Sequence, residues 1–172
     1  LTAYRLPLTA YRLPLTAYSS MKYWLFKSEP STYGIDHLAK DRNTAWSGVR
    51  NYQARNYMRD EMKPGDRAFF CHSSCEEPGI AGIVEVARTA YPDASQFNRK
   101  SQYYDASATK DHPRWFNVDL KFVRKTRLVG LPELRAHEAL AKMLLLQRGN
   151  RLSITPVTQA EWEYIERLLE KK

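Results

Sequence analysis

The segment around Trp46 combines residue types that could bind a flat, polar ligand. Trp46 is followed by Ser47 and Gly48, and Arg50 and Asn51 come shortly after. A protein that reads one nucleobase takes it out of the stack, shields its faces with flat apolar groups and hydrogen-bonds its edge. Trp46 is the first candidate for a stacking wall, because turn-forming and polar residues surround it instead of a buried apolar run. A plain core role for Trp46 is the alternative.

Further polar and aromatic residues stand where elements are expected to begin or end. Glu29 closes an aromatic-rich strand, and it could accept a hydrogen bond from an exocyclic amine or cap the following helix. Asn51 could bond a base or cap a helix. For the others the alternatives are packing, for an aromatic residue or histidine, and plain surface exposure, for an arginine. The pocket candidates are Ser28, Glu29, Trp46, Asn51, Tyr52, His72, Ser73 and Trp115, and the phosphate-binding candidates are Lys27, Arg50, Arg55 and Arg151.

His72 stands between two cysteines, which raises the question of metal binding or nucleophilic catalysis. Cys71 and Cys75 supply two thiols, but no second Cys/His pair stands at zinc-finger spacing, so we expect no metal site. Adjacent side chains on a strand point to opposite faces, and this disfavours a hydrolase built on Cys71 and His72. The seven glycines are scattered, without a phosphate-binding loop. We therefore expect no enzymatic activity and no cofactor.

The composition indicates one basic globular domain. The 172 residues include 27 Lys and Arg against 19 Asp and Glu, a formal charge of +8, and hydrophobic residues make up 43%. This length supports one core of ordinary size. The basic balance favours a polyanionic partner, with an evenly basic surface as the alternative. We expect a monomer that binds nucleic acid.

The sequence also favours a location inside the cell. We find no run of about eighteen apolar residues that could span a bilayer, and no secretory signal pattern, so we expect no membrane partner. Two cysteines suit a reducing compartment. We therefore expect an intracellular protein.

The first 20 residues differ in kind from the rest of the chain. They read LTAYRLP twice and then begin the same unit a third time. Two short repeats are too few to stabilise a repeat fold. We therefore expect residues 1–20 to lie outside the fold and residues 21–172 to form the domain.

Hydrophobic patterning predicts strands interleaved with helices. Residues 91–113 lack a sustained period and are predicted to form a long surface loop, a kind of segment that is usually functional or disordered. Thr158 and Glu161 have the spacing of a capping box before the last helix. The expected strands are 22–28, 67–72, 79–88 and 115–128, and the expected helical segments are 35–42, 51–62, 131–147 and the C-terminal stretch after Thr158. This pattern fits a small mixed barrel with helices packed outside.

The segment WSGVRNYQARN, residues 46–56, closely resembles the signature of the EVE domain family. Other blocks follow in the family's order and together span nearly all of residues 22–170. One departure is Cys71, which stands before the histidine where we expect an aromatic residue in this family. The further blocks are WLFKSEP from residue 24, FFCHS from 69, PGIAG from 78, AYPD from 90, WFNVD from 115 and RLSITPV from 151.

This resemblance implies an α+β, PUA-like β-barrel of about five to six strands, related to YTH domains, with helices outside. It also implies a pocket for an extruded base that carries a methyl or hydroxymethyl group, in DNA or RNA. For a eukaryotic source it implies a nuclear location, and for a bacterial source we expect the cytoplasm. Two other functions stay open, namely an RNA- or nucleotide-related enzyme on the same barrel and a small-molecule or protein-interaction domain. Binding by the latter would depend little on salt, whereas phosphate contacts make affinity fall steeply with salt.

Overall fold

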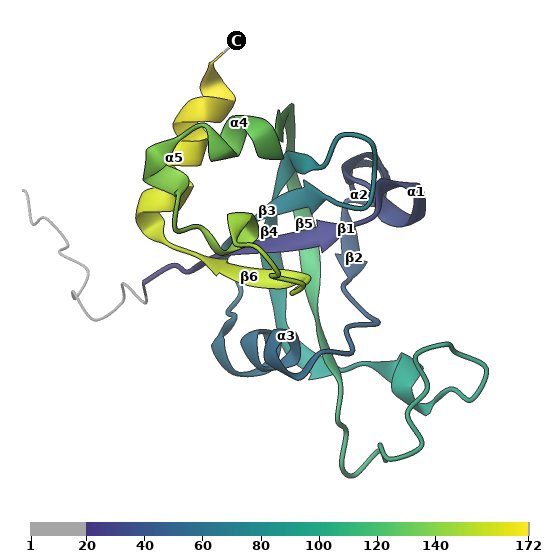
Figure 1. The fold of residues 1–172 in the computed structure, drawn as a ribbon. Coiled ribbons are helices and arrows are strands. Elements are labelled where there is room, and N and C mark those ends of the chain that lie inside the picture. Colours follow the sequence, from purple (N-terminus) through teal and green to yellow (C-terminus); the bar gives the residue numbers. More distant parts are fainter. Residues whose placement is uncertain (1–19, 172) are drawn as a thin grey trace, which may run out of the picture.

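A six-stranded sheet forms the centre of the fold (Figure 1). The computed structural model describes residues 20–171, so the repeat expected to lie outside the fold falls outside the described residues, except Ser20. The strand order is β2-β5-β4-β3-β1-β6, in which β1 and β3 run parallel and the other neighbours antiparallel. The strands are β1 (Tyr23–Ser28), β2 (Asn43–Ala45), β3 (Arg67–His72), β4 (Gly79–Pro92), β5 (Phe116–Gly130) and β6 (Ile154–Val157).

The expected mixed α+β class is confirmed, but the sheet does not close into a barrel. Within residues 20–171 the strand pairing ends at β2 on one side and at β6 on the other. These strands have only 3 and 4 residues, too few to form a continuous seam. The β4–β5 register shifts at several points, where bulges bend the strands. The sheet is therefore open, and β1 and β6 run across β4 and β5 in Figure 1.

The helices match most of the expected positions. The expected segments 35–42 and 51–62 correspond to α2 and to α3 with the turn after it. The elements are α1 (Pro30–Tyr33), α2 (Ile35–Asp41), α3 (Tyr52–Asn56), a π-helical turn (Tyr57–Glu61), α4 (Leu131–Arg135), α5 (Gln159–Glu170), and 3₁₀ turns at Ala94–Phe97, Glu138–Leu140 and Leu144–Leu146.

The segment 131–147 is less helical than predicted. Only α4 is an α-helix there, and two 3₁₀ turns follow it. The Gln147 amide donates to the carbonyls of Ala141 and Met143 at 2.9 and 3.2 Å, and the Asn150 amide donates to that of Leu144 at 2.7 Å. Side chains thus bind carbonyls that a continuous helix would bond internally. The leucine pattern of this segment therefore indicates which residues are buried, but it does not indicate a continuous helix.

The capping box predicted for the last helix is confirmed. Thr158 Oγ1 accepts from the Glu161 amide at 3.2 Å, and Glu161 Oε2 accepts from the Thr158 amide at 3.0 Å. Both satisfy amides that the helix start leaves without an internal partner. The predicted apolar stripe of α5 is buried, since Trp162, Ile165 and Leu169 all lie in a core cluster.

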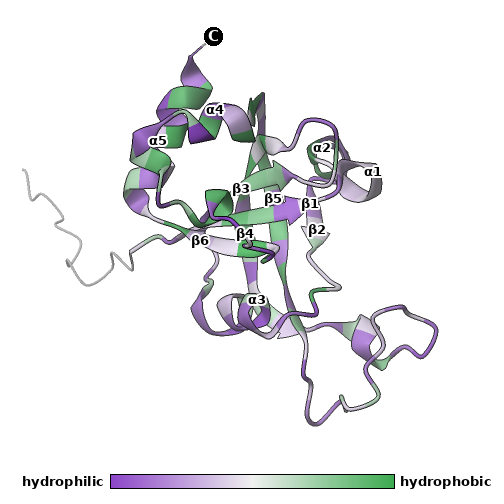
Figure 2. Ribbon diagram, in the orientation of Figure 1, coloured by the Kyte–Doolittle hydropathy of each residue, from purple (hydrophilic) through white to green (hydrophobic). Residues whose placement is uncertain are grey.

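Both faces of β1 are buried over its first part, which explains the apolar run Tyr23–Phe26. Trp24 and Phe26 belong to a core that α2 and α3 cover. Leu25 points the other way and belongs to a second core, where α5 packs. Figure 2 shows mostly hydrophobic colouring on the central strands and mostly hydrophilic colouring on the loop after β4. None of the described helices is both long enough and apolar enough to cross a membrane.

Candidate functional site

A cleft of about 660 Å³ opens beside the carboxyl end of β1. Its walls come from the β1–α1 junction, from β2 and the segment that follows it, from the loop between β4 and β5, and from a residue just before β6. The lining residues are Lys27, Ser28, Glu29, Thr32, Tyr33, Thr44, Ala45, Trp46, Ser47, Gly48, Val49, Arg50, Gln102, Tyr103 and Ser153. Five predicted site residues therefore line the cleft. Three of them, Lys27, Ser28 and Glu29, lie at the end of β1, and the other two are Trp46 and Arg50.

Trp46 lies half-buried between the core and the cleft. Its ring meets Phe26 and Phe70 in T-shaped contacts, with centroid distances of 5.5 and 5.8 Å. Its amide donates to the Val118 carbonyl at 2.8 Å. Trp46 is thus both a core residue and a cleft residue, because packing against core phenylalanines holds the indole while part of it faces the cleft.

The β1–α1 junction presents polar groups to the cleft. Ser28 Oγ donates to the Tyr33 carbonyl at 2.6 Å, which fixes the turn into α1. Glu29 occupies the N-cap position of α1, but its side chain makes no capping hydrogen bond. It is exposed and lines the cleft, so its carboxylate is available to a ligand. Lys27 lies beside them in the same wall.

Gly48 is the point where the long β4–β5 loop meets the cleft. Its φ of +80° suits glycine, and a Cβ there would come within 2.8 Å of the Tyr103 ring. The Gly48 amide donates to Asp93 Oδ2 at 2.8 Å. The missing side chain therefore lets Tyr103 pack directly on the backbone at the cleft wall.

Asp93 is a buried carboxylate that joins the loop to this wall. Its side chain accepts from the Gly48 amide, from Arg50 Nη1 at 3.0 Å, and from the Ser95 amide and hydroxyl at 2.9 and 2.6 Å. Burial alone would raise the pKa of Asp93, but the hydrogen bonds from Ser95, Gly48 and Arg50 outweigh it and hold the pKa below its ordinary value. Asp93 is therefore a fixed negative charge under the cleft wall.

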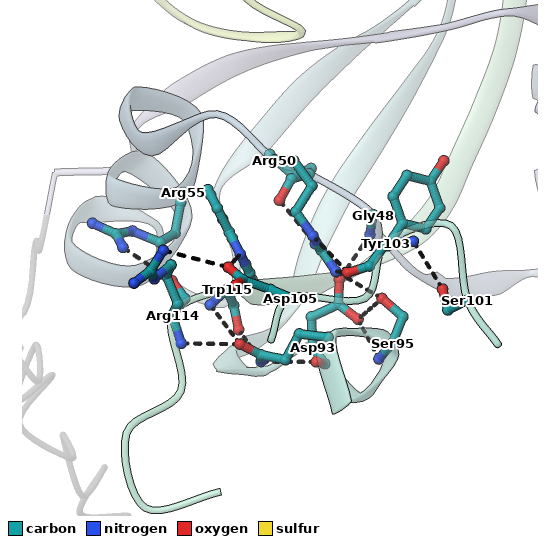
Figure 3. A network of polar contacts seen from close by, with 12 residues as sticks. Gly48, Arg50, Arg55, Asp93, Ser95, Ser101, Tyr103, Asp105, Arg114 and Trp115 are labelled. Atoms are coloured by element: carbon teal, nitrogen blue, oxygen red, sulfur yellow. Dashed lines mark hydrogen bonds and ion pairs between the residues drawn. The ribbon is translucent and has the colours of Figure 1, made fainter. Parts of the chain in front are cut away.

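Arg50 lines the cleft, but its guanidinium is already occupied. It donates twice to the Tyr103 carbonyl, at 2.7 and 3.1 Å, and once each to Ser95 Oγ, Asp93 and the Val49 carbonyl. Figure 3 shows Arg50 and Ser95 converging on Asp93. A guanidinium with its donors paired inside the protein holds local structure, so the geometry favours a positioning role for Arg50 over phosphate binding.

Tyr52 and Trp115 form an aromatic pair outside the cleft. Their rings stack at 5.0 Å, and Trp115 Nε1 donates to Asp105 Oδ2 at 2.7 Å. Trp115 is buried, whereas Tyr52 is 52% exposed. The Arg55 guanidinium lies 4.8 Å from the Tyr52 ring and donates to the Arg114 carbonyl at 3.0 Å. These three candidates support the base of the loop and do not line the cleft.

The remaining candidates also lie outside the cleft lining. Asn51 caps α3, because its Oδ1 accepts from the Ala54 amide at 3.0 Å. His72 Nε2 accepts from the Ile35 amide at 3.1 Å, and burial lowers the pKa of this histidine. The Ser73 amide donates to the Ser28 carbonyl at 2.9 Å, behind the β1 end. Arg151 is exposed, and Ser153 reaches the cleft in its place.

The thiol of Cys71 is not available as a reactive group in this structure. Cys71 is buried in the second core, and desolvation raises its pKa to about 12. Its thiol therefore stays protonated at neutral pH. Within residues 20–171, no three His, Cys, Asp or Glu side chains come together as a metal site would require.

Sequence reasoning did not single out Tyr103, Gln102, Thr44 or Ser153 as cleft residues. Tyr103 stands in a polar stretch without periodicity, and its partner Gly48 is far away in the sequence. The available signals were a long loop and a glycine beside Trp46, and neither identifies the contact between them. Asp93 was visible only as the last residue of a short sequence block.

Comparison with known proteins points to one family. The EVE domain profile matches residues 22–168. Thymocyte nuclear protein 1 of Gallus gallus is 44% identical over 170 residues, covering 87% of this chain and 69% of that protein. The Homo sapiens protein of the same name is also 44% identical over 170 residues, covering 87% and 75%.

Solved structures agree with this match. The structure of human THYN1 protein in complex with 5-methylcytosine containing DNA has a TM-score of 0.83 at 41% identity, covering 88% of this chain and 99% of that one. A crystal structure of a Pseudomonas syringae protein has a TM-score of 0.81 at 46% identity, covering 85% and 98%.

Proposed function

This chain belongs to the EVE domain family, and from that premise we propose that it reads a modified base of nucleic acid in the cleft beside Trp46. The resemblance found in the sequence is thereby confirmed. The observation that carries the proposal is the cleft itself, in which three aromatic rings, a carboxylate and small polar side chains line one concave site. The human relative crystallised with 5-methylcytosine containing DNA supports this substrate class.

Trp46 and Tyr103 are the proposed walls for the base. Both line the cleft, and both are held from behind, Trp46 by core phenylalanines and Tyr103 by Gly48 and Arg50. The cleft volume of about 660 Å³ lies within the usual range of small-ligand sites. An extruded base fits such a site because stacking on an aromatic face replaces the stacking that it loses in the strand.

Glu29 is the proposed group that reads the edge of the base. An ionised carboxylate is an acceptor only, and it pairs with the exocyclic amine of cytosine. Glu29 lines the cleft and makes no capping bond, so it can take this role without losing an internal contact. Ser28 lies beside it, and Lys27 is the proposed phosphate contact in the same wall.

The other predicted residues have supporting roles in this proposal. Asn51 caps α3, and His72 and Ser73 hold the β1–α1 junction from behind. Tyr52 and Trp115 hold the base of the loop that carries Tyr103. We assign Arg50 to positioning, and also Arg55, whose guanidinium donates to Asn56 Oδ1 and to the Arg114 carbonyl, and we keep Arg151 as a phosphate contact outside the cleft.

The proposed activity is binding without turnover. The acceptor Glu29 and the aromatic walls suffice for recognition, and the thiol of Cys71 is buried and protonated. The vertebrate relatives carry the word nuclear in their names, and for a eukaryotic source of this chain we propose the same compartment.

A binding titration tests the proposal. Short DNA and RNA strands carrying cytosine, 5-methylcytosine, 5-hydroxymethylcytosine or N6-methyladenine are titrated with the full chain and followed by fluorescence anisotropy. We expect tighter binding of 5-methylcytosine than of cytosine. Tyr103→Ala should lower that affinity by about 5- to 150-fold, the equivalent of roughly 1–3 kcal/mol of base stacking.

Tyr104 provides the matched control. It is the same residue type on the same loop and is 38% exposed, as Tyr103 is, but it does not line the cleft. Tyr104→Ala should therefore bind as the wild type does. Equal losses in both variants, or equal affinity of the wild type for modified and unmodified strands, would contradict a base-reading cleft. Release of a chemically changed base would show that the protein is an enzyme.

A further inference from the structure

The loop from Asp93 to Trp115 is closed at its base by one buried glutamine. Gln96 is fully buried, and its amide group donates to the carbonyls of Asp93 and Trp115, both at 2.8 Å. Its Oε1 accepts from the Arg114 and Trp115 amides, both at 2.9 Å. The Asp93 amide also donates to the Trp115 carbonyl at 2.9 Å. One side chain thus joins the two ends of the loop with four hydrogen bonds.

The outer part of the loop is also ordered by hydrogen bonds. Asn98 Oδ1 accepts from the Lys100 amide at 3.0 Å, and the Asn98 carbonyl accepts from the Ser101 amide at 2.9 Å. The Tyr103 amide donates to Ser101 Oγ at 3.1 Å, and Arg50 holds the Tyr103 carbonyl. The turn is therefore fixed relative to the cleft that Tyr103 and Gln102 line.

Arg99 and Lys100 lie at the exposed end of this turn, immediately before the cleft-lining residues. Consecutive Cα atoms are about 3.8 Å apart, so the Lys100 and Gln102 Cα atoms lie within about 7.6 Å of each other. In the part of the chain that the structure describes, neither cation has a carboxylate within 4.0 Å. By contrast, Arg114 pairs with Asp105 at 3.6 Å.

We propose that the Asp93–Trp115 loop is a phosphate-binding arm, in which Arg99 and Lys100 contact the backbone of the strand whose base enters the cleft. This inference rests on the proposed function. Unpaired cations gain most from phosphate because they give up no internal partner and displace the counterions of the strand. The loop projects from the body of the domain in Figure 1, where a strand can reach it. Because the turn is already ordered, little conformational entropy of the loop is lost when a strand binds.

The salt dependence of binding tests the arm. Each phosphate contact contributes a slope of about −0.9 to log affinity against log salt on duplex DNA. For a duplex carrying 5-methylcytosine, the Arg99→Gln/Lys100→Gln variant should therefore lose about 1.8 of the wild-type slope. Between 50 and 200 mM salt the wild-type affinity should then fall about twelvefold more than that of the variant. The preference for 5-methylcytosine over cytosine should be unchanged, because phosphates carry no base information.

An equal charge change elsewhere is the control. Arg135 and Arg167 are exposed on α4 and α5, away from the loop in Figure 1, and the double change to Gln should leave the slope near the wild-type value. An unchanged slope in the Arg99/Lys100 variant, with base preference retained, would overturn the arm and leave the base-reading cleft in place. Equal slope losses in the Arg99/Lys100 and Arg135/Arg167 variants would also overturn the arm, because the slope would then reflect the overall charge of the protein. A wild type without base preference would instead refute the proposed function, and with no salt-dependent binding at all both proposals fail.

Discussion

The Asp93–Arg50 pair should contribute far more to stability than an ion pair of similar geometry on the surface. The Asp93 side chain is 1% exposed and accepts four hydrogen bonds, two of which join it to Gly48 and Arg50. Asp93→Asn keeps the shape but removes the charge and turns an NH₂ group toward two donors. Breaking a buried pair on one side costs about 3–5 kcal/mol, and here the Gly48 amide and the Arg50 guanidinium would lose the acceptor atom that they share.

The Arg127–Glu133 pair is the matched comparison. Its two contacts are 2.9 and 2.7 Å, no longer than the 3.0 Å of Arg50–Asp93, but its side chains are 35% and 38% exposed. Water and salt screen such a pair, and Glu133→Gln should cost less than about 1 kcal/mol. Both changes turn a carboxylate into an amide, so their difference measures burial together with the hydrogen bonds that Asp93 accepts from Gly48 and Ser95.

Urea unfolding followed by tryptophan fluorescence measures both variants. With a slope of about 2 kcal/mol per molar urea, Asp93→Asn should lower the midpoint by roughly 2 M and Glu133→Gln by less than about 0.5 M. The pKa of Asp93 is lowered in the folded state, so its contribution is complete above the ordinary carboxyl pKa and is lost as pH falls through the folded value. The gap between wild type and Asp93→Asn should therefore narrow in acid. Equal midpoint shifts for the two variants at pH 7 would refute the reasoning.

Three further perturbations follow from the contacts described above. For Gly48→Ala, the loss in binding free energy for a 5-methylcytosine strand should exceed the loss in free energy of unfolding, because the new Cβ displaces Tyr103 from the cleft wall. Unchanged affinity would contradict this. His72 accepts from the Ile35 amide and its pKa is lowered, so the free energy of unfolding should fall as pH drops below about 6.5, and His72→Gln should lose this dependence. Thr158→Ala should cost about 1 kcal/mol in the same urea assay through loss of the α5 cap, and Thr126→Ala, whose hydroxyl bonds only the adjacent Arg127 carbonyl, should cost less.

The sequence predicted the elements whose signal is local. The aromatic-rich strand 22–28 and the capping box at Thr158 depend on neighbouring residues, and both are present in the structure. β2 and β6 were missed because three or four residues are too few to show a period, and they are strands only through their partners β5 and β1. Barrel closure depends on whether β2 and β6, which are far apart in the sequence, pair with each other, and no local pattern describes that pairing.

In the candidate site too, residues with a local signal were predicted and residues that meet through long-range contacts were not. Ser28, Glu29 and Trp46 were identified because polar residues beside an aromatic one, at the end of a strand, are a local signal. The sequence allowed Asn51 either to cap a helix or to bond a base. In the structure it caps α3, where the first amides have no partner within the helix. Arg50 and Tyr103 meet through the folded loop, and no short-range pattern in the sequence describes that meeting.

The closure of the loop at Gln96 has a consequence for how such a domain can diversify. Since one side chain bonds both ends, the intervening residues form a cassette whose length and composition can change without disturbing β4 or β5. Exchange of residues 98–104 between homologues would then transplant the aromatic wall and the adjacent cations as one piece. Gln96 in this way separates the strand ends, which its four hydrogen bonds hold together, from the outer loop residues that line the cleft.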